Sequence, residues 1–408
     1  MKGGRRFLEL DLESLAERII WHVLQWRLFR PIQPSLIHMN CFLLKGKTKE
    51  NLDLSVMVFA KYENTVQYLS ELAFSGTPQF TFLGRVTHNK ILSVINEHKP
   101  DLVLGDFAGI FSRFLSKSFL ILPTTNFSLD ISHSIEEINA NMMRLRRRSM
   151  RKARDSSYIY EVTKNPETLE SFYQDIYLPF TSKTAHDSFI RPVPFALMEK
   201  WFLSGELLLV KSNDKCLAGL LYHREHESTI HCRSIAYTEG LAAQAGLYRL
   251  IRTAKEDGYT RIDYGVAPPF MSDGLFFYKR SLGMEIGITG DDFLAVRLCN
   301  FEKPVQNFLI NNPFVFTDFM SMIGLVTIDR SMKVADEVSL SSLCHNYHTR
   351  GLHKLLILYP QEYKEKFGAL SSKDIHEMQL GALVSLTQLT HAANYELGIL
   401  IFQHSPET

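Results

Sequence analysis

Residues 246–259 read GLYRLIRTAKEDGY, and the chain continues with Asp263-Tyr264-Gly265 and with DGLFFYKRSLG at 273–283. Apolar and small residues recur at helical spacing over 241–257, and Gly258 is a typical residue to end such a helix. A short strand is expected at 261–265, and a second helix at 275–281 is again followed by a glycine. Helix, strand and helix in this order indicate a mixed α/β unit.

The segment before this stretch carries further regular patterns. Ser134-Ile-Glu-Glu137 has the spacing of a capping box, which predicts a helix from there to about Arg154. The second half of that helix reads NMMRLRRRSMRKAR at 141–154, and Asn165-Pro166-Glu167 opens another helix to 177. Strands are expected at 207–210, 217–224 and 230–236, and after the quoted stretch at 286–288 and 293–296.

The ordered set of a basic helix, a small-residue helix, a strand ending Asp-x-Gly and a helix with an aromatic-Lys pair before glycine resembles the FemAB-like branch of the GNAT (N-acetyltransferase-like) superfamily. The resemblance covers about 132–297. It implies a GNAT-like mixed α/β (α+β) sheet flanked by helices. One feature departs from the common pattern: the stretch Thr238–Gly246 lacks the Gln/Arg-x-x-Gly-x-Gly/Ala spacing of the pyrophosphate loop.

We divide the chain into three parts. Residues 1–129 are predicted to form an N-terminal α/β domain, with a helix at 10–29, and the resemblance would make it a degenerate first GNAT-like unit. Residues 130–303 are the predicted acyltransferase domain. Residues 304–408 form a small α/β C-terminal extension of unassigned role, with a strand at 355–358, a helix at 373–395 and a strand at 397–402. The apolar stretch 314–328 is too short to span a membrane, so we expect a buried or interfacial helix there.

The resemblance implies transfer of an acyl group from an acyl-CoA, or a similar activated donor, to the amine of a small molecule or peptide. A second hypothesis is a FemAB-type transferase that forms a peptide bond with aminoacyl-tRNA, in which case tRNA is a partner. The arginine-rich helix and the missing loop pattern favour this second hypothesis. A third is a non-catalytic GNAT-like module that binds RNA or protein.

The resemblance also suggests catalytic residues. Lys279 follows aromatic residues and would stabilise a developing oxyanion, or it is a surface lysine beside core aromatics. Asp263 would accept a proton or orient another group, or it caps the following turn. Tyr278 would protonate the leaving group, or it is a core tyrosine. His186 would line the acceptor cleft.

A second group of residues is predicted to bind the donor or its phosphates: Arg144, Arg147, Arg148, Arg151, Gly246 and Arg249. Clustered like charges repel, and guanidinium binds phosphate through two parallel hydrogen bonds, so an anionic partner would relieve a cost. The alternative is a solvated helix end.

The amino-acid composition limits the classes of protein to which the chain can belong. The 408-residue chain has a net charge of +1 and 45% hydrophobic residues, which is typical of a globular protein without a global field for nucleic acid. Its five scattered cysteines form no Cys-x-x-Cys, so we expect reduced thiols and no metal. Acidic residues interrupt the basic N-terminal start, so we expect a cytoplasmic protein with no stable membrane insertion.

Overall fold

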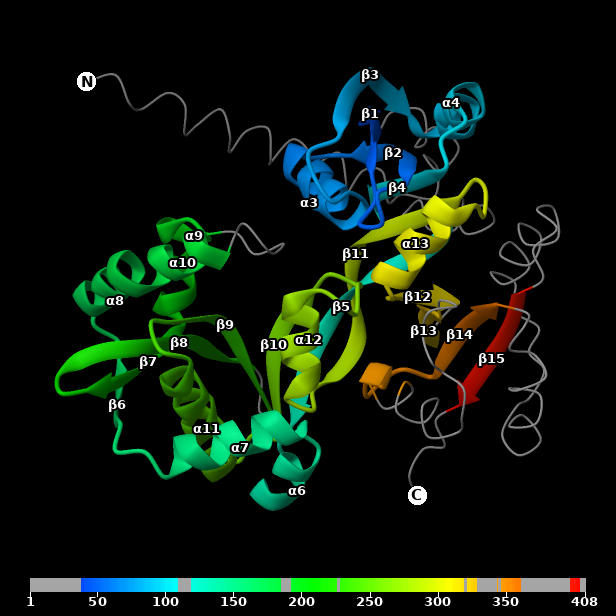
Figure 1. The fold of residues 1–408 in the computed structure, drawn as a ribbon. Helices are drawn as coiled ribbons and strands as arrows, with labels where there is room; N and C mark the ends of the chain where they lie inside the picture. Colours follow the sequence, from blue (N-terminus) through cyan, green and yellow to red (C-terminus); the bar gives the residue numbers. More distant parts are fainter. Residues whose placement is uncertain are drawn as a thin grey trace, which may run out of the picture.

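The computed structural model describes residues 38–108, 119–184, 192–225, 228–318, 321–328, 343, 346–360 and 397–403. The strands in these ranges form a single mixed sheet of 15 strands, with helices packed against both of its faces (Figure 1). Its main path runs β3-β1-β2-β4-β11-β5-β10-β9-β8-β7-β6, and β12 to β15 branch from it. The predicted mixed α/β class with helices around a sheet is confirmed.

The N-terminal part begins with an antiparallel group of strands. Its elements are β1 (His38–Lys47), β2 (Asp53–Ala60), α3 (Glu63–Ala73), β3 (Gln79–Thr87), η2 (His88–Lys90), α4 (Ile91–His98), β4 (Leu102–Ala108) and β5 (Leu120–Asp130). β2 and β4 are parallel neighbours, as expected for strands joined by a helical crossover. The apolar run 54–60 predicts a strand and the pattern over 63–74 predicts a helix, and both agree with β2 and α3 within a residue or two, whereas β1 and β5 have no such signal.

The second part contains a longer run of helices and strands. They are α6 (Ile135–Ala140), α7 (Arg144–Arg154), β6 (Ile159–Thr163), α8 (Pro166–Phe172), η4 (Tyr173–Tyr177), α9 (Leu178–Thr184), α10 (Phe195–Leu203), β7 (Gly205–Ser212), β8 (Lys215–Glu225), β9 (Thr229–Tyr237), α11 (Gly240–Glu256), β10 (Arg261–Ala267), α12 (Gly274–Ser281), β11 (Glu285–Leu298) and α13 (Lys303–Asn311). β6 to β9 are antiparallel. Side chains of α8, η4 and α10 pack on one face of these strands, and those of α11 and α12 pack on the other.

The capping box is present, but the single helix predicted to run to Arg154 is wrong. Ser134 Oγ accepts from the Glu137 amide at 3.2 Å, and α6 ends after Ala140. The chain then buries Met142, which is 2% exposed, and the Met143 amide donates to the Ser281 carbonyl at the end of α12. α7 follows and buries Met150 and Ala153, so one face of this basic helix packs against the rest of the protein.

Two further predictions need correction. The strands expected at 286–288 and 293–296 are one strand, β11, whose register against β5 shifts between Ile288 and Phe293. The stretch 314–328 is not a helix but the antiparallel pair β12 (Phe314–Asp318) and β13 (Ser321–Thr327). Nearly all of its described side chains are buried, and strands buried on both faces give the same continuous apolar pattern as a buried helix.

The remaining strands extend the sheet from β13. β14 (Lys354–Pro360) is parallel to β13, and β15 (Leu397–Gln403) is antiparallel to β14. Both strands were predicted. The helices predicted at 10–29 and 373–395 lie outside the described residues. Among the described helices, none is long and apolar enough to cross a membrane.

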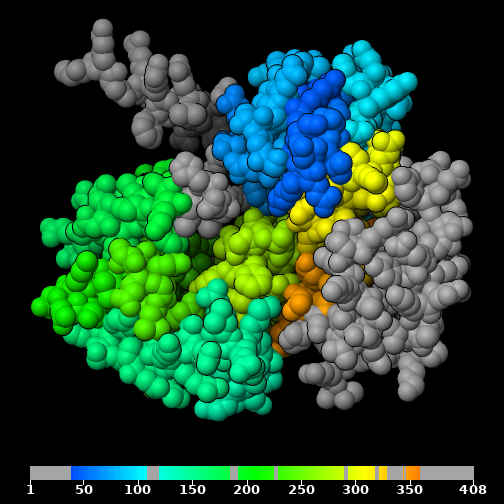
Figure 2. Space-filling view, viewed as in Figure 1, coloured from blue at the N-terminus to red at the C-terminus, as the bar shows by residue number. Residues whose placement is uncertain are grey.

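One strand links the two parts of the sheet. β5 pairs antiparallel with both β10 and β11, so a strand from before the predicted boundary at 129/130 lies between two strands from after it. The sheet therefore continues across both predicted boundaries, and the division into three domains stays a prediction. The parts also touch through side chains: Tyr68 of α3 donates to Asp273, the N-cap of α12, and Figure 2 shows the blue N-terminal part against the yellow-green segment.

Candidate active site

The sheet opens between β9 and β10. These parallel strands pair only over Thr229–His231 and Arg261–Asp263, and beyond that each strand continues without the other (Figure 1). The two strands separate after the His231–Asp263 pair. We call the region formed by the separating segments 232–237 and 264–267 the fork. α11 connects the two strands and begins at Gly240, three residues after the end of β9. Its N-terminal N–H groups therefore lie at the open end of the fork, where a helix dipole favours an anion.

A bulge in β10 shapes one side of the fork. The register of β10 against β5 shifts between Asp263 and Val266, and Gly265 takes a φ of +67°, which a side chain would strain. The side chain of Lys279, on α12, contacts this bulge. Its Nζ donates to the carbonyls of Tyr264, Gly265 and Val266 at 2.8, 3.0 and 2.9 Å.

Lys279 is thus a buried cation with its three N–H bonds directed at backbone carbonyls. It is 6% exposed, and burial lowers its pKa from 10.5 to about 8. This geometry fixes the bulge and leaves no N–H for an oxyanion. The structure therefore places Lys279 at the fork, while its predicted contact with a reacting group stays a prediction.

Tyr278 lies between α11, β9 and β10. Its hydroxyl accepts a hydrogen bond from Gln244 Nε2 of α11 at 3.2 Å, and the Arg146 guanidinium stands 4.8 Å from the centre of its ring. Burial raises the pKa of Tyr278 to about 12, with Gln244 and Arg146 acting in the opposite direction. The hydroxyl is therefore protonated at neutral pH, as a group that donates a proton must be.

Two buried polar atoms beside Tyr278 have no hydrogen-bond partner. They are the hydroxyl of Tyr264, on β10, and Oε1 of Gln244, on α11. Their side chains are 7% and 5% exposed, and an unpaired buried polar atom costs about 1–3 kcal/mol. A hydrogen-bond donor and an acceptor are thus both left unpaired beside Tyr278.

Asp263 contacts a residue that the sequence did not suggest as catalytic. Asp263 Oδ1 accepts from the Gly265 amide at 2.6 Å, and Oδ2 lies 3.2 Å from Nδ1 of His231 on β9. The first contact caps the turn and the second orients His231, while a catalytic role of Asp263 stays a prediction. Sequence patterns gave no sign of His231 because they do not show which strands are neighbours.

The predicted donor-binding arginines lie on α7, which packs against α11. Ala153 of α7 belongs to the same buried cluster as Ala242, Ala243 and Ala245 in the first turns of α11. Arg144, Arg148 and Arg151 are exposed, and Arg147 is half-buried. The C-terminal half of α7 therefore places positive charge beside the start of α11.

The other two predicted donor-binding positions have local contacts. A Cβ on Gly246 would lie 2.4 Å from Leu220 Cδ1, so this glycine allows α11 to pack closely on the sheet. Arg249 lies over the ring of Tyr160, at 5.9 Å. Binding of the donor by these residues stays a prediction.

The start of α11 also carries a negative charge. Glu239 is the N-cap residue, makes no capping hydrogen bond through its side chain, and accepts from the Tyr158 hydroxyl. Its carboxylate would repel a phosphate at the helix N-terminus. This observation agrees with the missing pyrophosphate-loop pattern.

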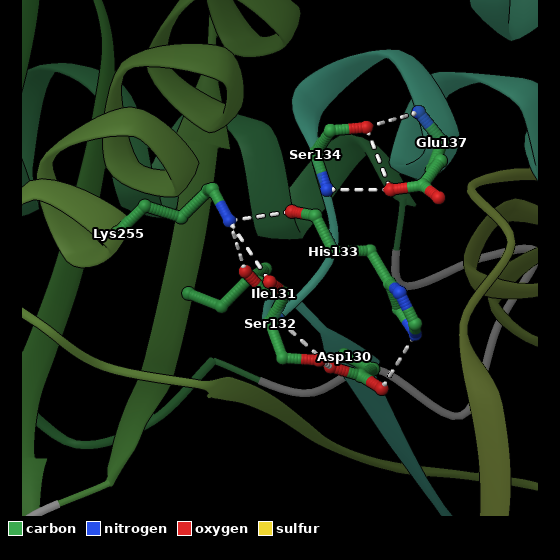
Figure 3. A network of polar contacts seen from close by, with 7 residues as sticks. All are labelled: Asp130, Ile131, Ser132, His133, Ser134, Glu137 and Lys255. Carbon is green, nitrogen blue, oxygen red and sulfur yellow. Dashed lines mark hydrogen bonds and ion pairs between the residues drawn. The ribbon is translucent and has the colours of Figure 1, made fainter.

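A second cation holds the arm that carries α7. Lys255, near the end of α11, donates to the carbonyls of Ile131 and His133, while Asp130 accepts from Ser132, as Figure 3 shows. The link between β5 and α6 is thereby fixed to α11. The arginine-rich helix α7 is thus held against the start of α11 through Ala153, and the link that precedes it is held near the end of α11 through Lys255.

The remaining predictions concern His186, the cysteines and metal binding. His186 and Cys344 lie outside the described residues. No group of three or more His, Cys, Asp or Glu side chains among the described residues could hold a metal ion. Burial raises the pKa values of the Cys41 and Cys232 thiols to about 12, so neither is a nucleophile at neutral pH.

Residues 140–280, from the end of α6 to α12, match the family model of the acetyltransferase (GNAT) domain, so the GNAT resemblance is confirmed for this segment. Acyl transfer in general is the chemistry of this class. No curated protein matches the sequence.

Solved structures that align with the chain include the following three. FemX is 14% identical over 62% of this chain and 83% of its own, with a TM-score of 0.36. L-PGS from Bacillus licheniformis is 14% identical over 66% and 88%, with a TM-score of 0.32. A probable N-acyltransferase from Enterococcus faecalis V583 is 12% identical over 90% and 86%, with a TM-score of 0.29.

Proposed function

We propose that the chain transfers an acyl group from an acyl-CoA, or a similar activated donor, to the amine of a small molecule or peptide. The observation that carries this proposal is the fork with its two unpaired buried polar atoms. A fold does not leave a buried hydroxyl and a buried amide oxygen unpaired without cost, and a bound ligand would remove that cost. Acyl transfer within one ternary complex needs groups that hold donor and acceptor in place.

The donor would lie between β9 and β10 as an extended chain. An amide N–H of the donor would bind Gln244 Oε1, and an amide carbonyl would accept from the Tyr264 hydroxyl. Because Glu239 makes the start of α11 unfavourable for phosphate, the donor phosphates would bind the exposed arginines of α7 instead. Lys279 acts in this scheme by holding the bulge of β10, which sets the width of the fork.

Tyr278 would act as the general acid. The donor's leaving group departs as a thiolate or alkoxide, and the Tyr278 hydroxyl supplies its proton. His186 keeps its predicted place in the acceptor cleft.

An aminoacyl-tRNA is the second candidate donor. The basic surface of α7 favours it, since a nucleic acid backbone offers several phosphates in a row where coenzyme A offers a compact cluster. A non-catalytic binding module is the third candidate.

The test is turnover with a panel of donors. The purified chain is incubated with acetyl-CoA, longer acyl-CoA thioesters or charged tRNA, together with amine acceptors, and products are identified by mass spectrometry. Tyr278→Phe should lower kcat by about 10²–10⁴-fold while donor affinity changes little. Tyr259→Phe, a half-buried tyrosine that stacks with Arg224 away from the fork, is the matched control. Donor binding without transfer by any pair of substrates would favour the binding-module hypothesis.

A further inference from the structure

The last paired residues before the fork are both ionisable. His231 and Asp263 are directly opposite in the parallel register of β9 and β10. Nδ1 of His231 and Oδ2 of Asp263 are 3.2 Å apart, and each side chain is 19% exposed. The pair is therefore partly open to solvent at the point where a donor's acyl group would lie.

Asp263 is held in a fixed orientation. Its other oxygen accepts from the Gly265 amide at 2.6 Å, within the bulge that Lys279 braces. A carboxylate beside Nδ1 fixes the imidazole with its proton on Nδ1 and makes Nε2 the basic nitrogen. The same relation between a carboxylate and an imidazole is used for proton transfer in many hydrolytic sites.

Neighbouring side chains keep the His231 ring in place. The His223 ring of β8 stacks on it, with centroids 5.2 Å apart and planes at 12°. Arg233 Nε donates to His223 Nδ1 at 3.3 Å, and its guanidinium lies 5.9 Å from the Trp201 ring. His231 thus belongs to a layer of planar groups on the face of the sheet covered by α10.

The pair and Tyr278 lie on opposite faces of the sheet. Cys232, next to His231, is buried in the cluster that packs under α11 and α12, and side chains of successive strand residues point to opposite faces. A donor placed through the fork would therefore have Tyr278 on one side and His231 on the other. An amine could approach from the His231 side while the leaving group departs on the Tyr278 side.

We propose that His231 is the general base for the acceptor amine and that Asp263 is its positioning residue. The amine nitrogen forms a bond to the acyl carbon, and Nε2 of His231 takes the proton that this nitrogen loses. The bond from the acyl carbon to sulfur or oxygen breaks, and the leaving group takes the proton of Tyr278. His231 then releases its proton to solvent and Tyr278 regains one, so the sum is an amide and a free thiol or alcohol. This inference rests on the proposed function.

The test compares His231→Gln and Asp263→Asn with the wild type, using the donor and acceptor that the wild type turns over. His231→Gln should lower kcat by about 10²–10⁴-fold with unchanged donor affinity, and Asp263→Asn should lower it by about tenfold or more. His133→Gln is the matched control, because His133 also pairs with an aspartate, Asp130 at 3.5 Å, but lies on the surface at the end of β5. Because the His133 carbonyl also helps to hold the arm before α7, His98→Gln, at the last residue of α4, serves as a second control. His98→Gln should retain wild-type kcat, and His133→Gln should retain it once donor affinity is shown to be unchanged.

Two readouts separate a base from a structural residue. Added imidazole should restore part of the activity of His231→Ala. The loss in His231→Gln should be smaller with hydroxylamine, which is uncharged at neutral pH, than with a basic alkylamine. A fully active His231→Gln, or an equal loss with both acceptors and no rescue, would overturn the proposal. If the wild type itself transfers nothing, the proposed function fails and the base falls with it, whereas an active wild type with an active His231→Gln refutes the base alone.

Discussion

Replacing Lys279 with methionine removes a charge while keeping most of the volume of the side chain. The structure makes this position a sensitive one, because a single buried ammonium satisfies three successive carbonyls of β10. After the substitution, the carbonyls of Tyr264, Gly265 and Val266 lose that donor together. The bulge that they form would then have no fixed shape.

The expected loss of stability follows from these contacts. A buried polar group left unpaired costs about 1–3 kcal/mol, so three such groups give a gross loss of about 3–9 kcal/mol. The buried ammonium itself is costly, as its lowered pKa indicates, and its removal returns part of that loss. We expect a net loss of about 3 kcal/mol, which is a large share of the stability of an ordinary domain.

The assay is urea unfolding of wild type and Lys279→Met, followed by circular dichroism, with turnover measured under native conditions. Stability and activity should fall together, since the bulge supports both the fold and the fork. A loss of less than about 1 kcal/mol would show that the carbonyl contacts do not brace β10. Lost activity with unchanged stability would instead restore the reading of Lys279 as a group that contacts the oxyanion.

The same pair of proteins should differ in pH dependence. Burial holds the pKa of Lys279 near 8, below its ordinary value of 10.5, so above pH 8 the folded protein releases this proton before the unfolded chain does. Stability therefore rises with pH in this range, by up to about 1.4 kcal/mol per pH unit from this group. The difference in unfolding free energy between wild type and Lys279→Met should grow between pH 8 and 9.5. A constant difference would mean that Lys279 is not perturbed.

Other substitutions test separate features. Gly246→Ala should destabilise the fold by about 1–3 kcal/mol in thermal unfolding, because its Cβ would lie 2.4 Å from Leu220 Cδ1, and an unchanged Tm would contradict this packing. If the donor is tRNA, each phosphate contact should contribute about −0.7 to −0.9 to the slope of log affinity against log salt, so that three or four contacts give a slope of about −3. Neutralising Arg147, Arg148 and Arg151 of α7 together should flatten this slope. Equal slopes for the wild type and the triple variant would show that α7 is only solvated. Native Cys41 and Cys232 should resist thiol reagents, and changing all five cysteines to serine should leave activity largely unchanged, so an acyl-cysteine adduct would refute that expectation.

Local patterns explain which elements could be predicted. α11, β10 and α12 were found because helical spacing and stopping glycines act within a few residues, and Gly258 and Gly283 both have positive φ. The Ser134 capping box was found for the same reason. The break between α6 and α7 was not, because it depends on the burial of Met142 against α12, which is remote in sequence.

The catalytic roles assigned to Asp263, Tyr278 and Lys279 stay predictions, but the structure brings these three residues together at the fork. The partner of Asp263 could not be predicted, because His231 meets it only through the parallel pairing of two strands that α11 separates. The three carbonyls that Lys279 binds likewise depend on a bulge whose register is set by β5.

The position of β5 has a consequence for synthesis on the ribosome. This strand is complete at Asp130, yet its main partners β10 and β11 begin only at Arg261 and Glu285. At about 5–20 residues per second, the roughly 130 intervening residues take on the order of 10 s to emerge. During that time the apolar side chains of β5 have no place in a sheet, so the nascent chain presents an aggregation-prone segment. A chaperone that binds extended apolar segments should therefore be found on stalled chains that end between 131 and 260, and should leave once 298 has emerged.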